Sequence, residues 1–118
     1  KETLFALVMH EKGDLDFNQE LGHISTGCEA GISFLSMQGN GDIHICRRMN
    51  SFIGNAIEDS FEDIFYNSND INEIRDYDNY EACGKCELKN MCRGCPAISK
   101  ETFGSIKKKD PQCWKVIH

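Results

Sequence analysis

The sequence predicts a small α+β domain in which a β-hairpin is followed by short helices and by cysteine-rich loops. Three observations predict it: an Asn-Gly pair between two β-prone segments, apolar residues at helical spacing further along, and seven cysteines. The chain has 118 residues, of which 40% are hydrophobic, so it is one domain's worth of protein. Because a core of this size stabilises a fold only weakly, we expect the cysteines to hold the domain together.

The hairpin is predicted by segments 32–37 and 42–46, which flank a turn that contains Asn40-Gly41. Asn and Gly both tolerate a positive φ, so this pair is a strong signal for a tight hairpin turn. A second turn is expected over residues 51–55, where a glycine precedes an asparagine.

Three short helices are expected after the hairpin. A helix over 60–66 is predicted by Ser60, which starts a capping box, and by the apolar residues that follow at helical spacing. Similar spacing predicts another turn or two of helix over 69–76. Because proline is tolerated in a first turn, Pro96 favours a last helix over 97–103.

Residues 1–27 are interpreted as a connector from an upstream domain. Their apolar run, 4–9, fits either a buried strand or a fragment of a helix, and it is much shorter than the about 20 residues that cross a bilayer. Residues 11–20 are polar and typical of a loop. Because no leader of secretory type is visible, we expect a cytoplasmic protein that does not enter a membrane.

The net charge of −6 is unevenly distributed along the chain. Residues 58–81 contain nine acidic side chains and one basic side chain, which is the pattern of a solvated helix face. Residues 82–118 contain eight basic and three acidic side chains. The pI is near 5.1 and no basic patch is interleaved with aromatic residues, so nucleic acid is excluded as the expected partner.

Four of the cysteines lie within thirteen residues, in the pattern Cys83-x2-Cys86-x5-Cys92-x2-Cys95. A span this short closes around a metal at little cost in loop entropy. Zinc is one candidate, but its paired knuckles usually lie about 12–20 residues apart, and four thiolates satisfy it. The odd number of cysteines and the lack of a leader argue against disulfides.

Iron–sulfur ligation fits the spacing better. In two-cluster ferredoxins, a cysteine run that ends in Cys-Pro sends its last cysteine to the other cluster. By the same logic Cys95, which precedes Pro96, joins a second cluster, and the distant Cys113 completes the first. Cys28 and Cys46 come from the two edges of the hairpin and complete the second cluster. The predicted α+β domain is therefore organised around two iron–sulfur clusters.

The whole pattern resembles the SPASM domain, the auxiliary iron–sulfur module at the C-terminus of many radical SAM enzymes. The family pattern begins with Cys, a variable gap and Gly-x4-Cys, which Cys28, Gly41 and Cys46 match. It continues with Cys-x2-Cys-x5-Cys-x3-Cys and a last Cys, and here two residues rather than three separate Cys92 from Cys95. The match covers most of the chain.

The resemblance implies two [4Fe–4S] clusters with a set of thiolate ligands for each. Auxiliary cluster I, called cluster I below, would use Cys28, Cys46 and Cys95. Auxiliary cluster II, called cluster II, would use Cys83, Cys86, Cys92 and Cys113. Residues 28–118 would form the SPASM-like domain, and residues 1–27 would connect it to an upstream radical SAM barrel.

The resemblance assigns only three cysteines to cluster I. Family members with full coordination have an eighth cysteine several residues before the first one, and residues 22–27 contain none. Cluster I is therefore expected to keep an open iron or to take His23 as a nitrogen ligand. An ordinary loop histidine is the simpler interpretation of His23.

A parent enzyme is also implied, because the sequence lacks the Cys-x3-Cys-x2-Cys motif of the cluster that binds S-adenosylmethionine. S-adenosylmethionine would bind only in that parent, a radical SAM oxidoreductase and, by the commonest theme of the family, a peptide- or protein-modifying maturase. The auxiliary clusters would transfer electrons or hold the substrate, with a reductant such as ferredoxin or flavodoxin. Arg47, Arg48 and Arg93 either offset the charge of the clusters or are ordinary solvated residues.

Two other functions stay open on the sequence alone. One is a structural zinc-binding module, and aerobic preparation could also leave zinc in place of iron. The other is a stand-alone electron carrier like a ferredoxin, which would need both clusters fully ligated by the protein.

Overall fold

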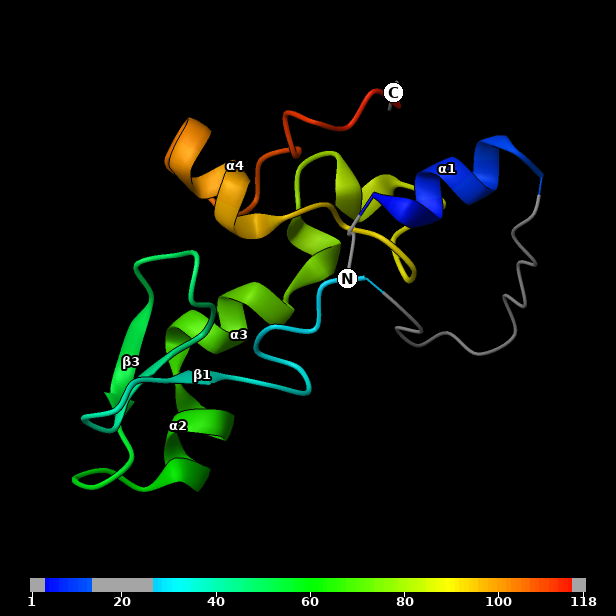
Figure 1. Cartoon of the computed structure of the whole chain (residues 1–118). Helices are drawn as coiled ribbons and strands as arrows, with labels where there is room; N and C mark the ends of the chain where they lie inside the picture. The colour runs from blue at the N-terminus through cyan, green and yellow to red at the C-terminus, as the bar shows by residue number, and fades with distance from the viewer. Residues whose placement is uncertain (1–3, 14–26, 116–118) are drawn as a thin grey trace. The chain divides into compact units, whose positions relative to one another are not determined.

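The computed structural model describes residues 4–13 and 27–115, which fall into two units (Figure 1). The hairpin unit comprises residues 29–76. The cysteine unit comprises the described residues of 1–28 and 77–118. Most of the polar stretch predicted over 11–20 lies outside the described residues, as does His23.

The hairpin unit contains the predicted hairpin. Strands β1 (Ser36–Met37) and β2 (Asp42–His44) pair antiparallel, with Met37 opposite Ile43. Gly41 lies at the turn with a φ of 91°, in the left-handed region that favours glycine. The hairpin is confirmed, although its strands are shorter than the segments 32–37 and 42–46 that predicted it.

A third strand replaces the turn that was expected over 51–55. Strand β3 (Phe52–Asn55) pairs antiparallel with β2 and completes a sheet of order β1-β2-β3. The expectation of a turn was wrong because Gly54 serves packing: a Cβ atom at Gly54 would lie 2.6 Å from Cδ1 of Ile64. Gly54 pairs with Ile43 in the sheet, so the glycine admits the helix that carries Ile64.

Helices α2 (Phe61–Asn67) and α3 (Asn69–Arg75) confirm the next two predictions. The Ser60 hydroxyl accepts a hydrogen bond from the Asp63 amide at 3.3 Å, which is the first half of a capping box. Helix α2 contacts both α3 and β3. Five isoleucines of this unit are buried: Ile43, Ile45, Ile64, Ile71 and Ile74. They form the core between the sheet and the helices.

The cysteine unit is built from short elements joined by loops. Helix α1 (Phe5–Glu11) shows that the apolar run 4–9 forms a helix rather than a strand. Two 3-10 turns follow the hairpin unit in sequence, η2 (Tyr77–Asn79) and η3 (Cys83–Lys85). Helix α4 (Pro96–Phe103) begins at the proline that predicted it. With eight residues it is the longest helix described, and no described helix is long and apolar enough to cross a membrane.

A hydrophobic core of the cysteine unit includes some of its cysteines. Leu4, Leu7, Leu88 and Cys92 form one buried cluster, against which Cys113 and two further partly buried residues pack. Leu7 is only 2% exposed, so the first helix contributes a side chain to this core. Apolar side chains and thiols therefore share the interior of the unit.

Candidate metal centre

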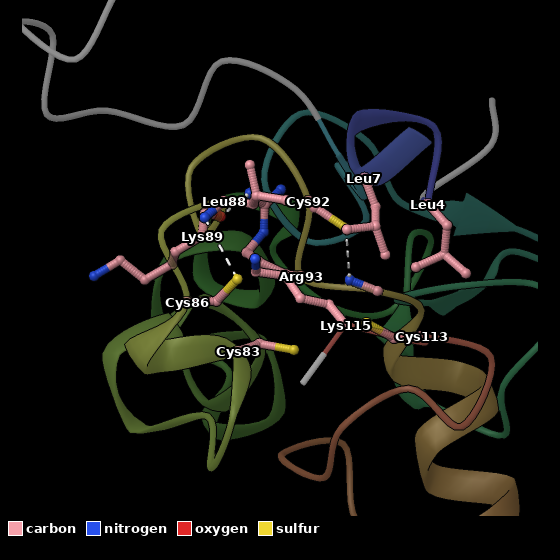
Figure 2. Close-up of a pocket in the computed structure, with 11 residues that line it drawn as sticks. Leu4, Leu7, Cys83, Cys86, Leu88, Lys89, Cys92, Arg93, Cys113 and Lys115 are labelled. Atoms are coloured by element: carbon pink, nitrogen blue, oxygen red, sulfur yellow. Dashed lines mark hydrogen bonds between the residues drawn. The ribbon is translucent and has the colours of Figure 1, made fainter. Parts of the chain in front are cut away.

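Four of the seven cysteines line a single pocket in the cysteine unit (Figure 2). They are Cys83, Cys86, Cys92 and Cys113. The cavity between these side chains measures about 20 Å³, so the thiols converge closely on one another. Its remaining lining comprises Leu4, Leu7, Leu88, Lys89, Arg93, Gly94 and Lys115. Within the described ranges, no three Cys, His, Asp or Glu side chains are arranged around a single ion-sized point.

Two close backbone contacts shape the first Cys-x2-Cys pair. Cys83 begins η3, and the amide of Cys86 closes that turn by donating to the Cys83 carbonyl at 3.2 Å. A Cβ atom at Gly84 would lie 2.6 Å from the carbonyl oxygen of Asp78. The first of the two residues between the thiols is therefore a glycine, because the preceding turn, η2, approaches it closely.

The second pair, Cys92 and Cys95, lies on a turn with an unusual backbone. Arg93 has a φ of 124° and Gly94 a φ of 64°, so two consecutive residues adopt positive values. Such a conformation is strained for a residue with a side chain and persists where the surroundings enforce it. The turn brings the Gly94 amide to 3.5 Å from the Cys92 sulfur. The Leu88 amide lies 3.4 Å from the Cys86 sulfur in the same way.

Arg93 has surroundings that explain its strained backbone. Its residue is only 4% exposed, and its guanidinium lies over the Tyr77 ring at 4.7 Å. Nη1 donates to the Lys89 carbonyl at 2.8 Å, and Nη2 donates to the Cys28 carbonyl at 3.0 Å. Of the two interpretations given for Arg93, solvation at the surface is therefore wrong. The side chain joins Cys28 to the turn that carries Cys92.

Asp110 is the second buried charged residue beside the cysteines. It is fully buried, and its two carboxylate oxygens accept hydrogen bonds from the Cys95 and Gln112 amides, both at 2.8 Å. Its carbonyl accepts from the Cys113 amide at 3.0 Å. One residue therefore fixes the backbone at two cysteines that are distant in sequence.

Burial and mutual proximity raise the pKa of two thiols in the pocket. The pKa of Cys83 rises to about 11, mainly because of burial and then because of the neighbouring Cys92 and Cys113. Burial likewise raises the pKa of Cys92, although the hydrogen bond from Gly94 opposes it. Without a bound cation these thiols are therefore held in the neutral form at physiological pH. A positive charge in the pocket would reverse that preference.

A comparison with protein families identifies the family of the chain. The family described as SPASM, an iron–sulfur cluster-binding domain, matches residues 28–96. The chain belongs to the SPASM family. Six of the seven cysteines lie in the matched segment, and Cys113 follows it.

Curated relatives of this SPASM domain carry one common name. The chain is 29% identical over 91 residues to an AdoMet-dependent heme synthase of Methanosarcina barkeri, which covers 76% of this chain and 26% of the relative. It is 30% identical over 91 residues to a protein of the same name from Oleidesulfovibrio alaskensis, covering 76% and 24%. The chain thus spans about a quarter of the length of these relatives. No solved structure matches it.

The cysteines predicted for cluster I are divided between the two units of the SPASM domain. Cys28 and Cys95 belong to the cysteine unit, and Cys46 belongs to the hairpin unit. All three are partly buried. The Arg48 amide lies 3.4 Å from the Cys46 sulfur, a contact like those at Cys86 and Cys92. His23, the candidate fourth ligand, lies outside the described residues.

Several residues of the site were not predicted from the sequence. Leu4 and Leu7 line the pocket although they precede the first cysteine by more than twenty residues. Their spacing of three residues is a helical signal, but it does not indicate which surface the helix covers. The role of Asp110 could not be predicted from the sequence either, because it depends on Cys95, which no local pattern connects to it.

Proposed function

We propose that this SPASM domain is the auxiliary cluster-binding part of a radical SAM enzyme and binds two [4Fe–4S] clusters. Cluster II is held by Cys83, Cys86, Cys92 and Cys113, and cluster I by Cys28, Cys46 and Cys95. The observation that carries the proposal is the pocket into which four thiols of the predicted cluster II set face together. Four thiolates are the usual ligands of such clusters.

The residues around the pocket suit an iron–sulfur group. Bound clusters supply one-electron chemistry, and hydrogen bonds to their sulfurs and exclusion of solvent tune it. Amides of Leu88 and Gly94 lie next to ligand sulfurs and would stabilise thiolates. Leu4 and Leu7 cover the pocket and limit the access of water. Because ligation needs deprotonated thiols, loading of the pocket releases the protons that burial retains on Cys83 and Cys92.

The parent reaction is supported by the names of the relatives. Because the chain spans about a quarter of them, we infer that a radical SAM barrel precedes it in the same polypeptide. The relatives' names favour a parent that acts in heme formation with S-adenosylmethionine. The prediction of a peptide- or protein-modifying maturase rests on the commonest theme of the family, and it stays a prediction. A ferredoxin or flavodoxin as reductant and a cytoplasmic location belong to the same proposal.

Metal analysis after anaerobic reconstitution tests the two-cluster proposal. We expect about eight iron and eight sulfide per chain, with visible absorption near about 400 nm. The Cys86→Ser variant should lose about half of the iron by disabling cluster II, and Cys46→Ser should lose the other half. Met37→Ser is the control, because Met37 is 66% exposed and is not a predicted ligand. A chain that folds normally and refuses iron would overturn the proposal.

Two alternatives give different results in the same measurements. A zinc module would contain zinc after anaerobic preparation from iron-replete cells and would lack the visible band. A stand-alone electron carrier would bind iron, but the coding sequence upstream of Lys1 would lack the Cys-x3-Cys-x2-Cys motif. Finding that motif supports the radical SAM parent.

A further inference from the structure

The hairpin unit contains an open groove that the cluster-binding proposal does not use. It is lined by Ser36, Met37, Gln38, His44, Arg47, Arg48, Met49 and Asn50. The cavity volume of the groove is about 320 Å³. Sites for small ligands commonly measure about 300–1,000 Å³. The groove is thus of a size that suits a small organic molecule or part of a larger one.

The groove collects the positive charge of an otherwise acidic unit. Residues 29–76 contain nine acidic side chains and only three basic ones, all of them arginines. Arg75 is used internally, because its Nε donates to the Gly31 carbonyl at 2.6 Å and its guanidinium lies over the Phe65 ring. The other two, Arg47 and Arg48, are adjacent, exposed and both in the lining of the groove.

The two arginines have the freedom to bind a ligand. Neither Arg47 nor Arg48 forms a side-chain ion pair with an acidic residue in the part of the chain that the structure describes. A guanidinium offers a planar fork of donors that fits a carboxylate with two parallel hydrogen bonds. Two neighbouring forks in one groove therefore favour a ligand with carboxylate groups.

The rest of the lining adds an apolar and a neutral polar surface. Met37 is 66% exposed and Met49 is buried, and both contribute to the wall. Nε2 of His44 and Nε2 of Gln38 lie 3.3 Å apart, so this pair offers further polar contacts. Methionine side chains adapt to the shape of an apolar partner. The lining as a whole matches an apolar body that carries acidic groups.

We propose that this groove binds the carboxylate groups of an organic ligand with an apolar body, through Arg47 and Arg48. We further infer that this ligand is the substrate of the parent enzyme. That second step rests on the proposed function, whereas binding in the groove does not. Arg47 and Arg48 directly follow Cys46, a proposed ligand of cluster I, and the Arg48 amide lies 3.4 Å from the Cys46 sulfur. The same chemistry occurs on a tetrapyrrole with carboxylate substituents and on an acidic peptide, and the experiment separates these sources.

Binding of defined probes to the 118-residue chain tests the proposal. The first probe is a water-soluble porphyrin with four benzoate groups, and the second is the same ring with four N-methylpyridinium groups. The third is a fluorescein-labelled peptide of alternating Leu and Asp. Fluorescence titrations are run at low ionic strength, where interactions between exposed charges are screened least. Both the anaerobically reconstituted chain and the reduced metal-free chain are titrated.

The Arg47→Gln/Arg48→Gln variant should weaken binding of an anionic probe by about tenfold or more. The Arg47→Lys/Arg48→Lys variant keeps the charge without the fork and should lose less. Lys12→Gln/Lys100→Gln is the matched control, because it removes two exposed positive charges of the cysteine unit, outside the groove. Met37→Asp places a negative charge on the wall, where it would repel the carboxylates of the ligand. It gives a second variant that should weaken binding.

The outcomes of the titrations distinguish the two ligand classes and test the proposal itself. Binding of the anionic porphyrin but not the peptide supports a tetrapyrrole carboxylate, and the reverse supports an acidic peptide. The proposal is overturned if neither anionic probe binds, if the cationic porphyrin binds as tightly, or if the control variant weakens binding as much as the arginine variant. Iron per chain is measured on the same samples. If the reconstituted chain takes up no iron and still binds an anionic probe through the arginines, the cluster proposal is refuted and the groove proposal stands.

Discussion

The carboxylate of Asp110 accepts a hydrogen bond from the backbone amide of Cys95 at 2.8 Å, across fifteen residues of sequence. The same side chain binds the Gln112 amide, and the Asp110 carbonyl accepts from the Cys113 amide. Cys95 is assigned to cluster I and Cys113 to cluster II. A single buried carboxylate therefore organises backbone next to a ligand of each proposed cluster.

Replacing Asp110 should destabilise the backbone at Cys95 and the backbone that precedes Cys113. Asp110→Ala leaves two amides without their acceptors, and a buried unsatisfied group costs about 1–3 kcal/mol. Asp110→Asn retains one acceptor oxygen and should have an intermediate effect. Iron content after reconstitution and the midpoint of denaturant unfolding should both decrease from wild type to Asp110→Asn to Asp110→Ala. Glu101→Ala, at an exposed position of α4, is the control and should match wild type. Equal iron and stability in Asp110→Ala and the control would contradict this role.

A comparison of Gly94 with Gly104 separates the effect of steric crowding from the effect of backbone conformation. A Cβ atom at Gly94 would lie 2.5 Å from Cβ of Asp110, whereas one at Gly104 would meet nothing within 4 Å. Both glycines are left-handed, with φ values of 64° and 77°. Gly94→Ala and Gly104→Ala therefore share the strain of that region, about 1–2 kcal/mol, and only the first adds a clash.

Thermal or denaturant unfolding of the two alanine variants measures the difference. We expect Gly104→Ala to lose about 1 kcal/mol and keep its iron, and Gly94→Ala to lose more stability and bind less iron. If the two variants behave alike, the close packing of Gly94 on Asp110 is not needed for the site.

The elements that the sequence predicts correctly are those whose causes are local. Asn40-Gly41 directs the hairpin turn through its own backbone preferences, and Ser60 caps α2 within a single turn. Pro96 begins α4 for the same kind of reason. Cysteine spacing is also local, and it led to the family that the comparison then showed.

The elements that the sequence misses depend on distant partners. Gly54 and Asn55 have the composition of a turn, but pairing with β2 and the approach of Ile64 make this segment a strand. Leu7 carries no sign that it covers a pocket formed by residues about 80 positions later. Tertiary contacts, not local propensity, decide both cases.

Arg93 should hold the backbone at Cys28 in place and so limit access of reagents to the Cys28 thiol. Its guanidinium donates to the Cys28 carbonyl at 3.0 Å and to the Lys89 carbonyl at 2.8 Å. Arg93→Lys keeps the charge but cannot make both contacts, and Arg93→Gln also loses the charge over the Tyr77 ring. In reduced, metal-free protein, the rate of Cys28 alkylation should increase from wild type to Arg93→Lys to Arg93→Gln. Peptide mass spectrometry measures this rate.

Alkylation of Cys46 provides the internal control for that experiment, because Cys46 lies in the hairpin unit and Arg93 in the cysteine unit. Its rate should be the same in all three proteins. Unchanged alkylation of Cys28 in Arg93→Gln, or a parallel increase at Cys46, would show that Arg93 does not specifically hold Cys28.

Leu7 should protect a bound cluster II from solvent. It is 2% exposed, lines the cysteine pocket and packs with Leu4 and Leu88. Leu7→Ala removes buried methyl groups at a cost of about 2–5 kcal/mol and opens a path for water and oxygen. We expect the visible absorption of the reconstituted chain to decay faster in air. Val8→Ala changes the next residue, which is half-buried and outside the pocket lining, and should decay like wild type. Equal decay of the two variants would show that α1 does not shield the cluster.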